Sequence, residues 1–431
     1  MKWGKEYEMK KVSVEDVLKI LKPGMTIVAG MTPMEPQLFL SHLHEADVDN
    51  VSIFTCLNIK DYNFYLDETY EGKFMNNSWF YGPSNREVVK KGIKTVTYVP
   101  NNLHQAGTNL ISSRKIDLFV GVASPMDKNG FLTLSASVVY EKDILEAAEM
   151  VVLEVNPNAP KTHGDTHVHI RDVDFVVEVD YPLPEISAVE PTDVERRIGE
   201  NIANLVENGS TIQLGIGGIP NSVALFLKDK KDLGVHTEML TDSMIDLFEM
   251  GVITNKKKTL WPGKFICTFA YGSKKMYEFI DDNPAVLFLR GKYVNNPYVI
   301  AQNEKMVSIN TAIMVDLTGN VCSEAIGTKH YSGTGGQLDT HRGAVMSRGG
   351  KGIIALRSTA KNGTVSTIVP LFPEGSPVTV PRQDVDYVVT EYGVAHLRGK
   401  TIRERVLELI SIAHPDFRGF LKKEAQKIGY L

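Results

Sequence analysis

The fold class is decided by one stretch of sequence, STIQLGIGGIP, at residues 210–220. Its first half is an apolar run that predicts a buried strand, and its second half is a glycine-rich turn. A helical pattern precedes it at 195–209, and another follows at 221–231, where Asn221 or Ser222 is the expected N-cap. A strand between two helices predicts the repeating unit of a parallel sheet and therefore an α/β fold.

The first half of the chain shows the same alternation of strands and helices. A helix is expected at 13–22 behind an N-cap at Ser13, and another after Ser84, ending at Gly92. Apolar runs rich in Val, Ile and Phe predict buried strands of a mostly parallel sheet at 25–30, 51–56, 94–99, 116–123 and 149–155.

The two halves of the sequence resemble each other in three places. The matching pairs, in the same order in both halves, are LKPGMTIVAG (21–30) with ENGSTIQLG (207–215), SPMDKNGFLTLS (124–135) with IMVDLTGNVCSE (313–324), and VDFVVEVDYPLPE (173–185) with VDYVVTEYGVAHL (385–397). We therefore expect two similar open α/β domains related by duplication, at residues 1–190 and 191–431, with the Pro-rich segment 181–195 as linker. Two such domains predict an active site in the cleft between them.

The composition excludes several classes of protein. With 431 residues, 43% hydrophobic and 23% charged, the chain has the balance of a globular protein rather than a disordered one. Its net charge of −5 argues against a nucleic-acid partner, and no run approaches the roughly 20 apolar residues of a membrane span. Three scattered cysteines and a charged N-terminus without an apolar core predict a cytoplasmic protein.

The glycine-rich turn is the first candidate binding site. Gly215, Gly217 and Gly218 lie where a strand ends and a helix begins, and exposed backbone N–H groups there suit a phosphate or an oxyanion. Pro220 breaks the dinucleotide-binding pattern, and the lysine of a P-loop is absent. The alternative is a tight turn whose glycines are needed only for positive φ.

Three further motifs carry polar side chains. Glu238 lies in HTEMLTD (236–242) at the end of an expected strand, where α/β proteins bind ligands, although a solvated or ion-paired glutamate is the alternative. A second glycine-rich loop at 331–339 is either a ligand contact or a flexible loop. The last motif is a histidine group, His163, His167 and His169, and we interpret it as structural and predict no metal site, because no carboxylate or cysteine set completes it.

Seven ordered motifs together resemble the acetyl-CoA hydrolase/transferase family, the class I CoA-transferases, over nearly the whole chain. They are YGPSNRE (81–87), VNPNAPKTHGDTHVHI (155–170), QLGIGGIPN (213–221), HTEMLTD (236–242), IGTKHYSGTGGQLDTHRGA (326–344), VDYVVTEYGVAHLRGK (385–400) and AHPDFR (413–418).

The resemblance implies roles for particular residues. Glu238 is the expected nucleophile, in the second domain, and Gly336 is expected beside the thioester. Gly82 to Ser84 would help to shape the entry side from the first domain. The expected contacts to coenzyme A are Gly215, Ile216, Gly217, Gly218, Ile219, Ile313 and Lys361.

The resemblance also implies a reaction. A CoA-transferase would move CoA between a short-chain acyl-CoA and a free carboxylate (4-hydroxybutyrate, butyrate or acetate) by a ping-pong route through a glutamyl-CoA thioester. Acyl-CoA and a short-chain acid would be the only partners apart from further copies of the chain in a dimer or tetramer, and no tightly bound cofactor is expected. The alternatives are an acyl-CoA hydrolase and a non-catalytic nucleotide-binding protein.

Overall fold

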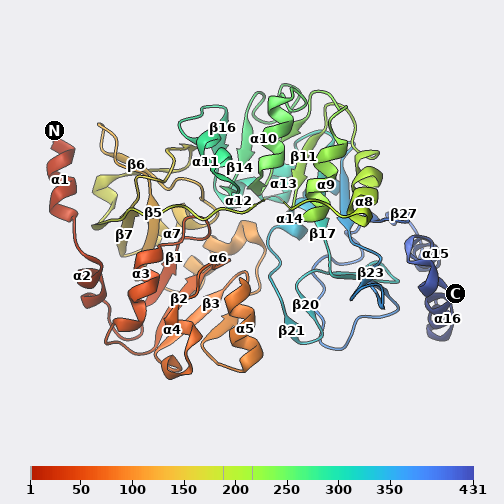
Figure 1. Cartoon of the computed structure of the whole chain (residues 1–431), viewed down its shortest axis with the longest axis horizontal. Helices are drawn as coiled ribbons and strands as arrows, with labels where there is room; N and C mark the ends of the chain where they lie inside the picture. Colours follow the sequence, from red (N-terminus) through yellow and green to blue (C-terminus); the bar gives the residue numbers. More distant parts are fainter. Residues whose placement is uncertain (1, 188, 216) are drawn as a thin grey trace. The chain divides into compact units, whose positions relative to one another are not determined.

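The computed structural model describes residues 2–187, 189–215 and 217–431, and divides them into two compact units. Unit 1 is Met1–Ile186 with Ile266–Val294, and unit 2 is Ser187–Phe265 with Asn295–Leu431. The chain is an α/β protein, as predicted, and each unit is built on a mainly parallel sheet with helices packed on it (Figure 1).

The sheet of unit 1 has seven parallel strands in the order β10-β7-β5-β1-β2-β3-β4. Their bounds are β1 Thr26–Ala29, β2 Val51–Thr55, β3 Phe74–Ser78, β4 Val96–Tyr98, β5 Leu118–Ala123, β7 Met150–Val155 and β10 Phe175–Glu178. All five predicted strands are present. The sequence analysis missed β3, because its Asn and Ser side chains interrupt the apolar pattern.

Helix starts in unit 1 agree with the prediction in one case and differ in another. Ser13 caps α2 (Val14–Lys19) and forms the expected reciprocal box with Asp16. Helix α5 (Pro83–Lys91) begins before Ser84, since proline suits the first helical position, and it ends at Gly92 as predicted.

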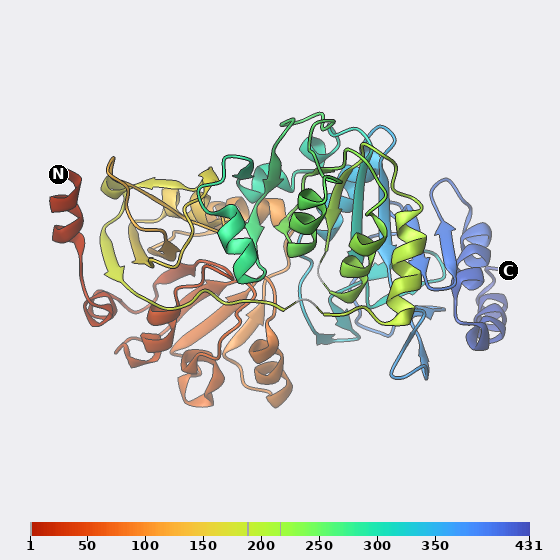
Figure 2. The ribbon, with the colours of Figure 1, turned by 45° about the horizontal axis from the view of Figure 1, so that its top comes forward.

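The sheet of unit 2 has six strands in the order β12-β11-β17-β22-β26-β27, parallel except for the last pair. Their bounds are β11 Thr211–Leu214, β12 Gly234–Val235, β17 Met306–Thr311, β22 Lys351–Ala355, β26 Tyr387–Thr390 and β27 Gly393–His396. Helices α8 (Asp193–Ala203), α9 (Gly218–Phe226) and α14 (Gln337–Met346) pack on this sheet, and Figure 2 shows α8 and α9 side by side. Helix α8 is shorter than the predicted 195–209, since it ends at Ala203.

The two sheets share a strand order, which supports the predicted duplication. Strands β10-β7-β5-β1-β2 of unit 1 correspond in order and direction to β26-β22-β17-β11-β12 of unit 2. Two of the three sequence matches fall on β1 with β11 and on β10 with β26. The third falls on a pair of Asp turns, in which Oδ1 of Asp127 or of Asp316 accepts from the backbone N–H groups two and four residues later.

The predicted ranges 1–190 and 191–431 differ from the observed units mainly in one segment. Ile266–Val294 belongs to unit 1 although it lies in the second half of the sequence. Arg290 of this segment donates hydrogen bonds to Asp143 at 2.6 Å and to Glu146 at 2.7 Å. These ion pairs join residues almost 150 positions apart, so no local pattern predicts them.

No helix in the described ranges has the length and hydropathy needed to cross a membrane. Among the same residues, no group of three His, Cys, Asp or Glu side chains is arranged to hold a metal ion. In the histidine group, His169 packs edge-on against Trp3 with 4.6 Å between ring centroids, while the rings of His163 and His167 lie 6.4 Å apart.

Candidate active site

The first glycine-rich turn leads directly into helix α9. Strand β11 ends at Leu214, and α9 begins at Gly218 with Gly217 as its N-cap at φ +112°. The predicted caps Asn221 and Ser222 are therefore wrong. The helix starts earlier because Pro220 fits its first turn, where the missing N–H costs no hydrogen bond.

Gly217 and Gly218 are glycines for different reasons. A Cβ on Gly217 would meet open space, but its left-handed φ favours glycine. A Cβ on Gly218 would lie 2.3 Å from Oε1 of Glu195, so a carboxylate of the protein lies against this glycine. Ile216, which was predicted in the same contact set, lies outside the described residues.

Glu238 follows strand β12 at the carboxyl edge of the sheet of unit 2. The side chains before it are fixed: His236 Nδ1 lies 3.3 Å from Nδ2 of Asn303, and the Thr237 hydroxyl donates to the carbonyl of Met239. His236 and Thr237 are buried, whereas Glu238 keeps partial solvent access. The extended HTE segment thus presents one carboxylate at the end of the sheet where α/β proteins bind ligands.

Two donors hold the Glu238 carboxylate. Asn295 Nδ2 donates to Oε2 at 2.8 Å, and the backbone of Gly336 donates a second hydrogen bond. Burial raises the pKa of Glu238 to about 7, and the nearby Asp339 raises it further, while the two donors oppose the shift. The carboxylate is therefore poised between its two protonation states near neutral pH.

Gly336 has a steric reason to be glycine. It is the N-cap of α14, and a Cβ there would lie 2.0 Å from both Oε2 of Glu238 and Nδ2 of Asn295. The sequence analysis expected Gly336 near the reacting group but missed Asn295. No signal in the sequence YVNNP distinguishes Asn295 from its neighbour Asn296, which caps the short helix α13 (Pro297–Ile300).

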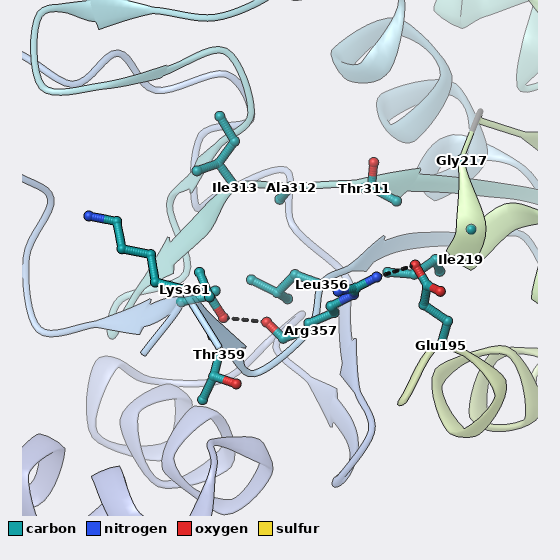
Figure 3. A pocket seen from close by; sticks show the side chains of 13 residues that line it. Glu195, Gly217, Ile219, Thr311, Ala312, Ile313, Leu356, Arg357, Thr359 and Lys361 are labelled. Atoms are coloured by element: carbon teal, nitrogen blue, oxygen red, sulfur yellow. Dashed lines mark hydrogen bonds and ion pairs between the residues drawn. The ribbon is translucent and has the colours of Figure 1, made fainter. Parts of the chain in front are cut away.

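A pocket of about 500 Å³ lies in unit 2 (Figure 3). Five predicted contacts line it: Gly217, Gly218, Ile219, Ile313 and Lys361. Its other lining residues are Glu195, Thr311, Ala312, Leu356, Arg357, Thr359, Ala360 and Thr367. Gly215, Glu238 and Gly336 are not among its lining, but the Gln337 side chain donates to the Thr311 carbonyl at 3.1 Å and so connects the Gly336 turn to the pocket.

Two cations line this pocket. Arg357 follows strand β22, and its Nη2 donates to Oε1 of Glu195 at 2.7 Å. Lys361 lies in the turn of a small hairpin, between β23 (Thr359–Ala360) and β24 (Val365–Ser366), with exposed side chain. Sequence reasoning missed Arg357, although its place after the buried run GIIAL is a signal for a ligand contact.

Comparison with known proteins identifies the family. Residues 1–186 match the acetyl-CoA hydrolase/transferase N-terminal domain, and residues 272–425 match the C-terminal domain of the same family. The chain belongs to the acetyl-CoA hydrolase/transferase family. The resemblance that the seven motifs indicate is thereby confirmed.

Relatives of this family member match it end to end. It is 44% identical to succinyl-CoA:cyclohexane-1-carboxylate CoA transferase of Geobacter metallireducens, over 99% of this chain and 97% of that one. It is also 44% identical to 4-hydroxybutyrate coenzyme A transferase of Clostridium kluyveri, over 99% and 100%. The crystal structure of RipA from Yersinia pestis superposes with a TM-score of 0.94 at 36% identity, over the whole of both chains. An acetyl-CoA hydrolase of Kluyveromyces lactis is more distant, at 28% identity over 73% of this chain.

Proposed function

We propose that this chain transfers CoA between a short-chain acyl-CoA and a free carboxylate, with Glu238 as the nucleophile. The observation that carries the proposal is the asymmetric setting of the Glu238 carboxylate. Oε2 accepts a hydrogen bond from Asn295 and lies against Gly336, whose backbone also donates to this carboxylate. Oε1 is thereby the oxygen that attacks, and Oε2 becomes the carbonyl oxygen of the acylated glutamate.

The proposed transfer proceeds through two covalent intermediates on Glu238. Oε1 attacks the thioester carbonyl and expels the CoA thiolate, which leaves a mixed anhydride on Glu238. The thiolate attacks the glutamyl carbon and releases the first acid, so that Glu238 now carries CoA as a thioester. A second carboxylate attacks the thioester and reverses both steps. Negative charge develops on Oε2 in each attack on the glutamyl carbon, where Asn295 and Gly336 supply fixed donors.

The pocket is our candidate for the CoA site. Lys361 supplies positive charge for the phosphate groups of CoA, and Ile219, Ile313 and Leu356 supply apolar contacts. The acids we propose are 4-hydroxybutyrate, butyrate and acetate, which follow the names of the relatives and the predicted family chemistry. A cytoplasmic homodimer or homotetramer without a tightly bound cofactor stays a prediction from the sequence.

The decisive variant is Glu238→Gln, which keeps the size of the side chain but removes its nucleophilic charge. We expect transfer from butyryl-CoA to acetate to fall at least about 1,000-fold, while the dissociation constant of CoA changes only a few-fold. Glu249→Gln, an exposed glutamate on the following helix α10 (Asp242–Glu249), is the matched control and should transfer normally. Turnover of the Glu238 variant within about tenfold of the parent would contradict the proposal.

The intermediate gives an independent test. Butyryl-CoA without an acceptor acid should convert the enzyme to the Glu238 thioester, and borohydride should reduce that residue to an alcohol. Mass spectrometry of the peptide around residues 236–242 locates the change. CoA release in water, without any acceptor, at the rate of transfer would instead assign the protein as a hydrolase.

A further inference from the structure

A buried carboxylate fills one end of the CoA pocket at the start of α9. Glu195 is only 7% exposed. Its Oε2 accepts from the backbone N–H of Thr192 at 2.8 Å and from the Thr192 hydroxyl at 2.9 Å, and its Oε1 accepts from Arg357. The same Oε1 lies against Gly218, the first residue of α9. The protein thus supplies its own anion at the place where the sequence pattern predicts a phosphate or an oxyanion.

Glu195 is ionised at neutral pH. Burial alone would raise the pKa of Glu195, but the hydrogen bonds from Arg357 and Thr192 outweigh burial and leave that pKa below its usual range. A helix N-terminus carries about half a positive charge, and the Glu195 carboxylate from α8, which lies against the first residue of α9, offsets it. A second anion placed there would therefore meet little attraction from α9 and repulsion from Glu195.

The opposite end of the pocket is cationic. Lys361 and Glu195 lie at opposite sides of the pocket, with Leu356 and Arg357 between them (Figure 3). Within the described ranges no carboxylate forms an ion pair with Lys361, whereas Arg357 is paired with Glu195. Thr311 also lines the pocket, and its carbonyl accepts a hydrogen bond from the side chain of Gln337, the residue after Gly336.

We propose that Glu195 is a positioning residue that sets the direction in which acyl-CoA lies in the pocket. It reserves the α9 end for the uncharged thioester and pantetheine part and directs the phosphate groups to Lys361. The inference rests on the proposed function for the identity of the ligand. With Glu195 in place, we expect inorganic phosphate to bind only weakly at the α9 end.

The first test removes Glu195, which should open its place beside α9 to a free anion. Glu195→Ala removes both the charge and the bulk beside α9 and leaves Arg357 unpaired. We expect inorganic phosphate to raise the thermal midpoint of this variant by several degrees and to compete with butyryl-CoA with an inhibition constant at least about tenfold below that of the parent. Thr192→Ala, which keeps the carboxylate and removes only the hydroxyl hydrogen bond to it, is the control and should gain no phosphate response. An equal response of parent and Glu195 variant to phosphate would overturn the inference.

The second test asks whether the phosphate groups of acyl-CoA lie at the Lys361 end of the pocket. Lys361→Gln should lower kcat/KM for butyryl-CoA relative to that for a phosphate-free butyryl thioester of N-acetylcysteamine, and the ratio should fall about tenfold. Lys422→Gln, an exposed lysine of helix α16 (Pro415–Ile428), should leave the ratio as it is. An equal loss for both thioesters would overturn the inference. A parent enzyme that transfers from neither thioester would refute the proposed function instead, and the phosphate test would still decide the role of Glu195.

Discussion

At the scale of single residues, the site combines one side chain that a motif reveals with one that only folding reveals. Glu238 could be predicted because it follows a strand in a recognisable HTE segment. Asn295 could not, since it lies 57 positions away and reaches Oε2 only through the tertiary fold. Glu195 was missed for the same reason: a glutamate three residues after Thr192 signals a helix cap, and its second role beside Gly218 depends on the packing of α8 on α9.

Asn295→Ala tests the donor to Oε2. Loss of one such donor to a developing oxyanion typically costs about 100- to 1,000-fold in kcat, and we expect a loss of this size here. Because the Asn295 hydrogen bond lowers the pKa of Glu238, its removal should also move the acidic limb of the pH profile of kcat/KM to higher pH. Asn296→Ala removes only the cap of α13 and should leave the profile unchanged. An unshifted pH profile in the Asn295 variant would mean that Asn295 does not control the ionisation of Glu238.

At the scale of elements, the sequence was most reliable where burial is uniform. Four of the five predicted strands of unit 1 (β1, β2, β5 and β7) are mostly apolar and largely buried, and such runs have few alternatives to a central parallel strand. Helix starts were less predictable. The Ser13 cap was predicted correctly because it is a local side-chain hydrogen bond, whereas α9 starts after Gly217, an N-cap without a side chain. The backbone conformation of a glycine leaves no mark in the sequence around it.

The two glycines at the start of α9 should respond differently to substitution. Gly217→Ala places a side chain at a positive φ in open space, so we expect a loss of about 1–3 kcal/mol from backbone strain. Gly218→Ala instead forces Glu195 away from Arg357 and Thr192. Glu195→Ala should therefore relieve the Gly218 variant and leave the cost of the Gly217 variant unchanged. Urea unfolding of the single and double variants measures this coupling, which we expect at about 1 kcal/mol or more for position 218 and near zero for position 217.

At the scale of the whole molecule, buried carboxyl groups in both units make stability and activity depend on pH in opposite directions. Glu35 and Glu154 of unit 1 are fully buried, and burial raises the pKa of each to about 7. Glu238 of unit 2 has a similar pKa for the same main reason. A carboxyl whose pKa is higher folded than unfolded favours the folded state while it is protonated, so its stabilisation fades as pH rises from about 4.5 through 7. The nucleophile needs the opposite, since only the ionised Glu238 attacks.

Transfer and stability should therefore change in opposite directions between pH 5 and pH 8. We expect kcat/KM for butyryl-CoA to rise about tenfold per pH unit below 7 and to level off above it.

His341, whose pKa burial lowers to about 4, affects stability in the opposite sense to the buried carboxyl groups. The stability effect of one carboxyl group is therefore best measured as the difference in unfolding free energy between a variant and the parent. Glu35→Gln removes one buried charge whose Oε1 has no hydrogen-bond partner among the described residues. Its stability relative to the parent should be unchanged below about pH 4.5 and should grow through pH 7 to a plateau of at most about 3 kcal/mol. Urea unfolding at pH 5 and pH 8 measures that difference, and an equal gap at both values would mean that Glu35 does not titrate in this range.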